Sequence, residues 1–165
     1  MLALVFSGIF VVIILPIIGV MVSLYFDSIL YLPKIIPIPL NIIIAIVIFT
    51  VGFFWALWSN FELFRIGKGS PVPLKGTQTI NLVEKGPYKY TRNPMVFGYI
   101  LIWLGLGFLF NSIFLLFGFT SIITVLLILF VKLWEEKNLE KRFGDSYLNY
   151  KRRVSFIIPL PPKKH

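Results

Sequence analysis

Residues 93–131 read NPMVFGYILIWLGLGFLFNSIFLLFGFTSIITVLLILFV, and these 39 residues contain no charged side chain. A helix needs about 20 apolar residues to cross the roughly 30 Å of hydrocarbon in a membrane, so the stretch is long enough for two crossings. Asn111-Ser112 is the obvious polar break near its middle. The stretch therefore predicts two membrane helices, 95–110 and 113–134, joined by a tight turn.

Two further charge-free blocks precede this stretch. Residues 1–26 and 35–61 contain no charged side chain, and each is long enough for one membrane helix. The composition agrees, because 58% of the residues are hydrophobic and only 14% are charged, against about 25% charged residues in soluble domains. We therefore expect an all-α integral membrane protein with four transmembrane helices.

The basic residues predict the orientation of these helices. Of 16 lysines and arginines, all except Lys34 fall within 65–92 or 132–164. Loops rich in Lys and Arg stay on the cytoplasmic side of a membrane. We therefore expect an integral cell-membrane protein with the 65–93 loop and both termini in the cytoplasm. The basic residues flank the spans without any known nucleic-acid motif, which predicts no nucleic-acid partner.

Several kinds of chemistry are excluded by residues that the chain lacks. There is no cysteine, and the one histidine is His165, so disulfides, thiolate nucleophiles and cysteine metal sites are ruled out and no metal centre is expected. No Walker loop, GxSxG, HExxH or strand-linked GxGxxG occurs. The absence of charge in 93–131 argues against an intramembrane proton or ion pathway.

A dense polar stretch, GPYKYTRNPM at residues 86–95, leads into the third predicted span. Pro94 suits the first turn of a helix, which makes Asn93 a candidate N-cap. The free N–H groups and positive dipole end of that helix, with Arg92 beside them, could hold a carboxylate or a phosphate. The alternative is an ordinary helix cap whose arginine faces lipid phosphates.

Two adjacent acids, Glu135 and Glu136, end the last apolar block. A carboxylate at the membrane interface is costly unless it is paired or hydrated, so one of them could face inward and bind a cationic group. Acids also oppose the dipole at a helix C-terminus, which makes a purely stabilising role unusual. The alternative is a solvated helix end, with Lys132 or Arg142 as weakly paired partners.

The segment after the last span alternates apolar and basic residues. Its apolar side chains recur at three- and four-residue spacing among lysines and arginines, at Leu139, Phe143, Tyr147 and Tyr150. This pattern predicts a C-terminal amphipathic segment at the cytoplasmic interface, split by Gly144 into two short helices.

The polar motifs, taken in order, resemble those of a known family. They are GPYKYTRNPM at 86–95, WEEKNL at 134–139, RFGDSYLNY at 142–150, Arg153-Val154 and Ile158-Pro159. This pattern resembles the isoprenylcysteine carboxyl methyltransferases and the related phospholipid methyltransferases, over about residues 69–159. The resemblance implies a small helical membrane domain that binds S-adenosylmethionine at the cytoplasmic helix ends.

The resemblance also implies which residues contact the cofactor. A cytoplasmic cofactor-binding loop and the start of the third span would line it, and Glu135 would complete the site from the fourth span. The cofactor's carboxylate would lie near the helix start at Arg92. The residues expected in the cofactor site are Ile80, Asn81, Leu82, Val83, Tyr88, Arg92, Asn93, Pro94, Met95, Val96 and Glu135.

The domain organisation follows from the same comparison. We expect one membrane-embedded methyltransferase domain over residues 1–165, with spans one and two in 1–66, the cofactor-binding core in 67–159 and a tail in 160–165. Its expected activity is methyl transfer to a lipid-like or prenylated substrate at the cytoplasmic interface. No residue is assigned a catalytic role, because the sulfonium of the cofactor is already activated.

Three positions depart from the family pattern. Asn93 stands where many relatives have histidine, and Val96 stands where many have tyrosine. Val131 lies four positions before the first glutamate, where the isoprenylcysteine enzymes carry a substrate arginine. Arginine is the natural partner of a carboxylate, so its absence weakens the prediction of a prenylcysteine substrate.

Two other functions stay open at this stage. Some sterol reductases share the C-terminal helical layout, so a membrane reductase that uses a nicotinamide cofactor is one alternative. A non-catalytic membrane scaffold is the other. The residues do not determine the methyl acceptor, any proton acceptor or the oligomeric state.

Overall fold

The computed structural model describes residues 10–69 and 78–162. In that part of the chain every regular element is helical, and the only strand-like feature is an isolated parallel bridge between Thr91 and Ser155. The predicted all-α class is therefore confirmed there. The predictions for residues 2–9 of the first span, 70–77 of the loop and 163–165 of the tail lie outside the described residues.

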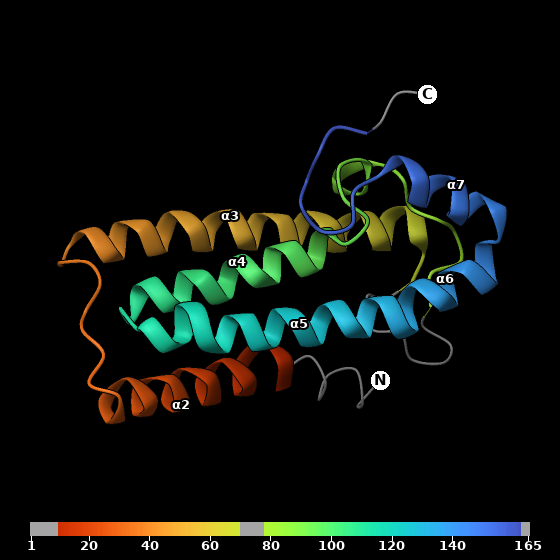
Figure 1. The fold of residues 1–165 in the computed structure, drawn as a ribbon. Coiled ribbons are helices and arrows are strands. Elements are labelled where there is room, and N and C mark those ends of the chain that lie inside the picture. Colours follow the sequence, from red (N-terminus) through yellow and green to blue (C-terminus); the bar gives the residue numbers. More distant parts are fainter. Residues whose placement is uncertain (1–9, 70–77, 163–165) are drawn as a thin grey trace. The chain divides into compact units, whose positions relative to one another are not determined.

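Within the described residues, three helices are long and apolar enough to cross a membrane, namely Phe10–Ile29, Leu40–Gly67 and Phe114–Phe143 (Figure 1). They combine α-helical and π-helical turns: η1 (Phe10–Ile14) with α2 (Leu15–Ile29); α3 (Leu40–Glu62) with η2 (Leu63–Gly67); and η4 (Phe114–Phe119) with α5 (Thr120–Phe130), η5 (Val131–Glu135) and α6 (Glu136–Phe143). Their length and composition are compatible with an integral membrane protein.

The helix predicted at 95–110 is present but short. It is α4 (Pro94–Leu109), an apolar helix of 16 residues, whereas a crossing needs about 20 residues. The structure therefore supports three candidate spans, and the fourth crossing stays a prediction.

The predicted turn at Asn111-Ser112 is confirmed. Asn111 has a φ of 53°, in the left-handed region, which asparagine adopts more readily than most residues because its short side chain bonds to nearby backbone. Its side-chain oxygen accepts hydrogen bonds from the backbone nitrogens of Ile35, at 2.9 Å, and Ile36, at 3.3 Å. The turn is thus fixed by the asparagine at position 111 and by its hydrogen bonds to Ile35 and Ile36.

Contacts within the chain define two units, Met1–Gly52 with Ile100–Val125 and Phe53–Tyr99 with Leu126–His165. The prediction of a single domain is not tested by this division and stays a prediction. In the first unit Trp103 is fully buried, and its ring lies 5.0 Å from that of Phe119, centroid to centroid. Gly19 of α2 faces both rings, so these helices approach closely because this position has no side chain.

This close approach gives a stability prediction. A Cβ atom at Gly19 would lie 2.6 Å from carbons of the Trp103 ring and 2.7 Å from Phe119. We expect Gly19→Leu to destabilise the protein by about 1–3 kcal/mol through overpacking, seen as a lower Tm in detergent. Met21→Leu is the control, because that side chain is exposed. A wild-type Tm for Gly19→Leu would contradict this packing.

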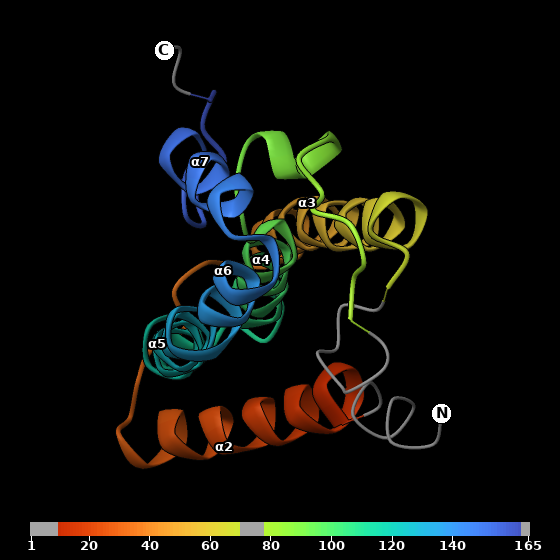
Figure 2. The same ribbon diagram turned by 90° about the vertical axis from the view of Figure 1, so that its right-hand side faces the viewer.

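The second unit contains the polar motifs. Its C-terminal part consists of α6 and α7 (Asp145–Arg153), separated at Gly144, whose φ of 52° is in the left-handed region. The predicted split of this segment into two short helices is therefore confirmed. The short 3-10 turn η3 (Gly86–Lys89) lies beside α7 in both Figure 1 and Figure 2.

Aromatic residues of α7 form the small core of this unit. Tyr147, Tyr150 and Val154 are buried together, and partly buried side chains from the loop and from α6 pack against them: Leu82, Leu139 and Phe143. All four side chains of the predicted apolar stripe after the last span thus form this core or pack against it. The core joins the loop before α4 to the end of the last long helix.

Candidate functional site

The segment before α4 is held in place by the chain that follows α7. The backbone nitrogen of Arg92 donates to the carbonyl of Ser155 at 2.9 Å, and Leu160 N donates to the carbonyl of Tyr90 at 3.0 Å. Thr91 Oγ1 also donates to the carbonyl of Phe156, at 3.1 Å. The polar motif is therefore not a free loop, because its backbone is paired with residues more than sixty positions downstream.

Asn93 lies directly before α4, as predicted for an N-cap. Its carbonyl accepts the first helical bond, from Phe97 N at 3.1 Å, while its side-chain nitrogen donates to the carbonyl of Phe156 at 2.8 Å. Asn93 and Pro94 are both buried. The start of α4 is thus fixed by the same C-terminal segment that holds residues 90–92.

A buried cluster of charges joins this segment to the last long helix. Arg92 Nη2 lies 3.0 Å from Glu136 Oε1, and Lys151 Nζ lies 2.8 Å from Glu136 Oε2. Lys151 Nζ is also 2.8 Å from Glu140 Oε1. The Glu136 side chain is only 7% exposed. The polar loop and the paired acids therefore lie against one another, as the sequence predicted.

The partners of Glu136 differ from those considered in the sequence. The alternative of a solvated helix end with Lys132 or Arg142 as partners is wrong for Glu136, which is buried and paired with Arg92. Lys132 Nζ instead lies 5.1 Å from the Phe156 ring centroid, and Arg142 lies 5.0 Å from the Phe143 ring. The cause is that burial makes a close pair with Arg92 far stronger than an exposed pair on the same helix.

Detailed geometry separates the two contacts of Arg92. Its Nη1 donates a hydrogen bond to the carbonyl of Lys151. The approach to Glu136 Oε1 is an ion pair at 3.0 Å without the angle of a hydrogen bond, since among the described residues neither that buried oxygen nor the buried Arg92 Nε has a hydrogen-bond partner. The charge pairing does not need this hydrogen bond, because Coulomb attraction at this distance does not depend on angle.

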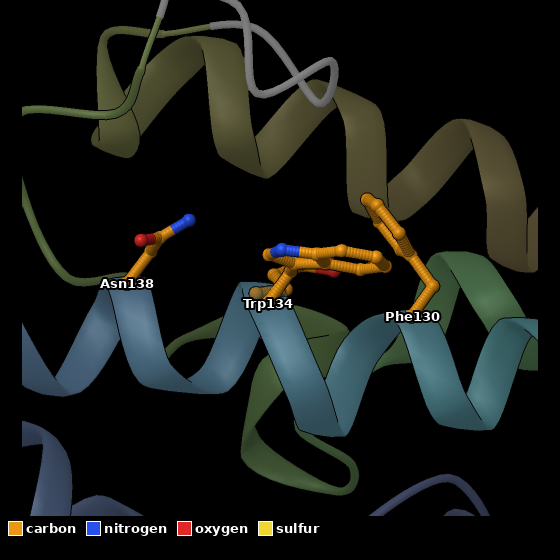
Figure 3. Close-up of a pocket in the computed structure, with 4 residues that line it drawn as sticks. Phe130, Trp134 and Asn138 are labelled. Carbon is orange, nitrogen blue, oxygen red and sulfur yellow. The ribbon is translucent and has the colours of Figure 1, made fainter.

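Glu135, the neighbouring acid, belongs to a different environment. It lines an open pocket of about 340 Å³ with Phe130, Trp134 and Asn138. Figure 3 shows Phe130, Trp134 and Asn138 projecting from the same face of the helix. The rings of Phe130 and Trp134 lie 6.1 Å apart, tilted by 46°. The pocket thus combines two aromatic faces with a carboxylate and an amide.

Sequence reasoning missed two of these pocket residues, Phe130 and Asn138, and used Trp134 only as part of a motif. A signal was available, because the three residues are four positions apart, a spacing that puts side chains on one helix face. Phe130 was hidden by its apolar surroundings. Asn138 was the clearer sign of a pocket, because its polar amide lies on the same helix face as two aromatic residues.

Tyr88 connects the loop to this acid electrostatically. Its ring is buried, and burial raises the pKa of the phenol well above its usual value, with the negative charge of Glu135 as the second cause. The Tyr150 hydroxyl donates to the backbone carbonyl of Tyr88 at 2.7 Å. Tyr88 and Glu135 are both residues of the predicted cofactor site.

Two tyrosines and a lysine beside the charge cluster have raised pKa values, which keep each of them protonated. Burial raises the pKa of Tyr147, with Glu136 as the next cause, and burial also raises the pKa of Tyr150. Hydrogen bonds to Glu136, and secondly to Glu140, raise the pKa of the Lys151 ammonium. At neutral pH the tyrosines are therefore neutral donors and Lys151 is a cation.

The remaining predicted cofactor residues occupy mixed surroundings. Val83 is buried, whereas Ile80 is exposed. The side-chain nitrogen of Asn81 donates to the carbonyl of Ile66 at 2.9 Å. Met95 and Val96 are half-buried in the first turn of α4. Contact of these residues, and of Leu82 and Pro94, with a cofactor stays a prediction.

The bond between Tyr150 and Tyr88 gives a second stability prediction. Tyr150→Phe keeps the ring in the core but leaves the Tyr88 carbonyl without this donor. We expect a loss of about 0.5–1.5 kcal/mol, or a Tm lower by roughly 2–4 °C per kcal/mol for a chain of this size, measured by differential scanning fluorimetry. Tyr31→Phe is the matched control, since Tyr31 is 91% exposed. Equal melting temperatures would contradict the bond.

The long apolar helices are compatible with an integral membrane protein, and one of them carries a buried charge cluster and an aromatic-acidic pocket near its end. The chain belongs to the phospholipid methyltransferase family, whose profile matches residues 40–146. The resemblance seen in the polar motifs is thereby confirmed, and the family implies a membrane methyltransferase acting on a lipid. No curated protein and no solved structure matches the chain.

Proposed function

We propose that this protein transfers a methyl group from S-adenosylmethionine to the headgroup of a membrane lipid at the cytoplasmic interface. The observation that carries the proposal is the family match over residues 40–146, which includes Glu135 in an aromatic-lined pocket. Neither a nicotinamide reductase nor a scaffold is favoured by these findings.

The side chains of the pocket suit this cofactor chemically. S-adenosylmethionine carries a sulfonium and an ammonium cation, a carboxylate, and ribose hydroxyls. A carboxylate such as Glu135 can accept from the ammonium or from a hydroxyl, and the faces of Trp134 and Phe130 attract a sulfonium. The volume of about 340 Å³ is at the lower end of the range of about 300–1,000 Å³ for small-molecule pockets.

The cofactor supplies an activated methyl group, so that the acceptor's lone pair forms the new bond to carbon while the sulfur–carbon bond breaks and its electron pair stays on sulfur. The protein then needs no nucleophile of its own. Its contribution is positioning, which can supply about 7–11 kcal/mol of the barrier.

The two acids are expected to have different roles. An amine acceptor that arrives as an ammonium must lose a proton before its lone pair can attack the methyl group. Glu135 is the better candidate to receive this proton, because Glu136 is already paired with Arg92 and Lys151. Arg92 is correspondingly less available to bind the cofactor's carboxylate than the sequence predicts, and we propose the start of α4, Asn93–Val96, for that group.

The favoured acceptor is a lipid amine. Val131, at the position of the substrate arginine in the isoprenylcysteine enzymes, is 1% exposed and cannot pair with a carboxylate. An amine lipid needs no such partner. We therefore place an amine-headgroup phospholipid ahead of a prenylated carboxylate.

Incubation of the purified protein with a labelled methyl donor tests the proposal. Vesicles would contain either an amine-headgroup phospholipid or a prenylcysteine analogue, and the lipids would be analysed by mass spectrometry. We expect label on the amine lipid and calorimetric binding of S-adenosylhomocysteine. Binding of a reduced nicotinamide instead would favour the reductase, and binding of neither would favour the scaffold.

A further inference from the structure

We propose that Glu136 is a positioning residue, which holds the 86–93 segment and α7 against the last long helix through Arg92 and Lys151. We call the contacts of Glu136 with Arg92 and Lys151 the clamp. Its use in cofactor binding rests on the proposed function, whereas the clamp itself does not.

The first argument is convergence of three separate segments on one carboxylate. Arg92 comes from the loop before α4 and Lys151 from α7, and they lie 3.0 Å and 2.8 Å from the two oxygens of Glu136 on α6. Arg92 also donates to the carbonyl of Lys151. Removing the carboxylate would thus release two elements at once.

The second argument is burial. The side chains of Glu136 and Arg92 are 7% and 11% exposed, so each charge depends on the other after losing its water. Removing one partner of such a pair leaves an uncompensated buried charge, which is far more costly than losing a surface pair. The pair Arg153–Glu84 lies in the same unit, but its side chains are 42% and 39% exposed, so it is a surface pair.

The third argument is the division between the adjacent acids. Glu135 lines the pocket with Trp134, while Glu136 is committed to the two cations. The π-helical turn η5 ends at Glu135 and α6 begins at Glu136, so the two acids lie on either side of this boundary. One acid is therefore free for a ligand because the other fixes the surrounding chain.

Hydrogen exchange on the ligand-free protein tests the clamp without any assumption about activity. We expect Glu136→Gln to raise exchange in peptides covering 86–93 and 145–153, and to leave peptides from Phe10–Ile29 unchanged. Glu140→Gln, which removes another carboxylate near Lys151 on the same helix, is the matched control and should change neither region. A uniform rise across all peptides, or no rise in 86–93, would overturn the proposal.

A double-mutant cycle adds a second test, and Arg92→Gln carries the hydrogen-exchange test in its place if Glu136→Gln fails to fold. Arg92→Gln and Glu136→Gln should each weaken S-adenosylhomocysteine binding by about tenfold or more. The double variant leaves neither Arg92 nor Glu136 charged, so its affinity should be no lower than that of the worse single variant. Losses that multiply would mean that the two residues act independently and would overturn the clamp.

The swapped variant, Arg92→Glu with Glu136→Arg, adds a test by cofactor affinity. A change in stability alone would not produce the result expected for a positioning role. The swapped variant should recover part of the affinity lost in either single reversal, at matched Tm. If the wild type binds no S-adenosylhomocysteine while exchange in 86–93 still depends on Glu136, the proposed function fails and the clamp stands.

Discussion

Glu135→Gln is expected to weaken S-adenosylhomocysteine binding by at least about tenfold while the protein keeps its wild-type Tm. The substitution keeps the size of the side chain and removes its charge. A hydrogen bond to a charged group contributes about 1.5–3 kcal/mol, and 1.4 kcal/mol corresponds to about tenfold in affinity. Tm should not change, because Glu135 lines an open pocket and the buried ion pairs of this helix are made by Glu136.

Isothermal titration calorimetry in detergent measures this loss directly, with Glu140→Gln as the matched control. Glu140 is a partly exposed acid on the same helix, paired with Lys151, and its removal should leave the affinity unchanged. Unchanged binding by Glu135→Gln would remove Glu135 from the cofactor site. A fall in Tm as large as that of Glu136→Gln would instead make it a structural residue.

The long helices and the turn between two of them were predictable from composition. Apolar blocks without charge have one dominant solution, a buried or membrane helix, and Asn111 is a residue that tolerates the left-handed turn that the structure contains. The status of α4 as a fourth crossing was not predictable in the same way. Its apolar sequence suits a span, but its 16 residues are fewer than the roughly 20 that a crossing needs.

The closeness of the polar loop and the paired acids was also predictable, but only through the resemblance of their motifs. Periodicity on the last helix could not identify the partners of Glu136, because Arg92 is 44 positions away and Lys151 lies beyond the break at Gly144. Local rules consider neighbours three or four residues apart, and these gave Lys132 as a candidate. Burial selected the distant arginine instead.

The pairing of residues 90–93 with 155–160 was not visible at all. Its acceptors are backbone carbonyls, as in the bond from Arg92 N to the Ser155 carbonyl, and backbone groups are the same whatever the side chain. Some donors are side chains, such as those of Thr91 and Asn93, which both donate to the Phe156 carbonyl. Their polar side chains were visible in the sequence, but their common acceptor was not.

Val131→Arg is expected to be the most damaging single substitution, although it restores the residue found in the isoprenylcysteine enzymes. Val131 is 1% exposed, so the new guanidinium would enter a filled, apolar position. A buried charge without a partner costs several kcal/mol. This is a large part of the roughly 5–15 kcal/mol that stabilises a folded domain, and we expect little folded protein.

Size-exclusion chromatography and Tm in detergent measure the folded fraction, with Val131→Met as the control for added volume without charge. Glu135, four residues along the helix, is the acid that an arginine at 131 could reach. A surviving folded fraction should therefore have lost S-adenosylhomocysteine binding, because the new arginine would form an ion pair with Glu135 and leave it unavailable to the ligand. A stable variant with wild-type affinity would show that position 131 is open to the site, and one that methylates a prenylcysteine carboxylate would reverse the preference for an amine acceptor.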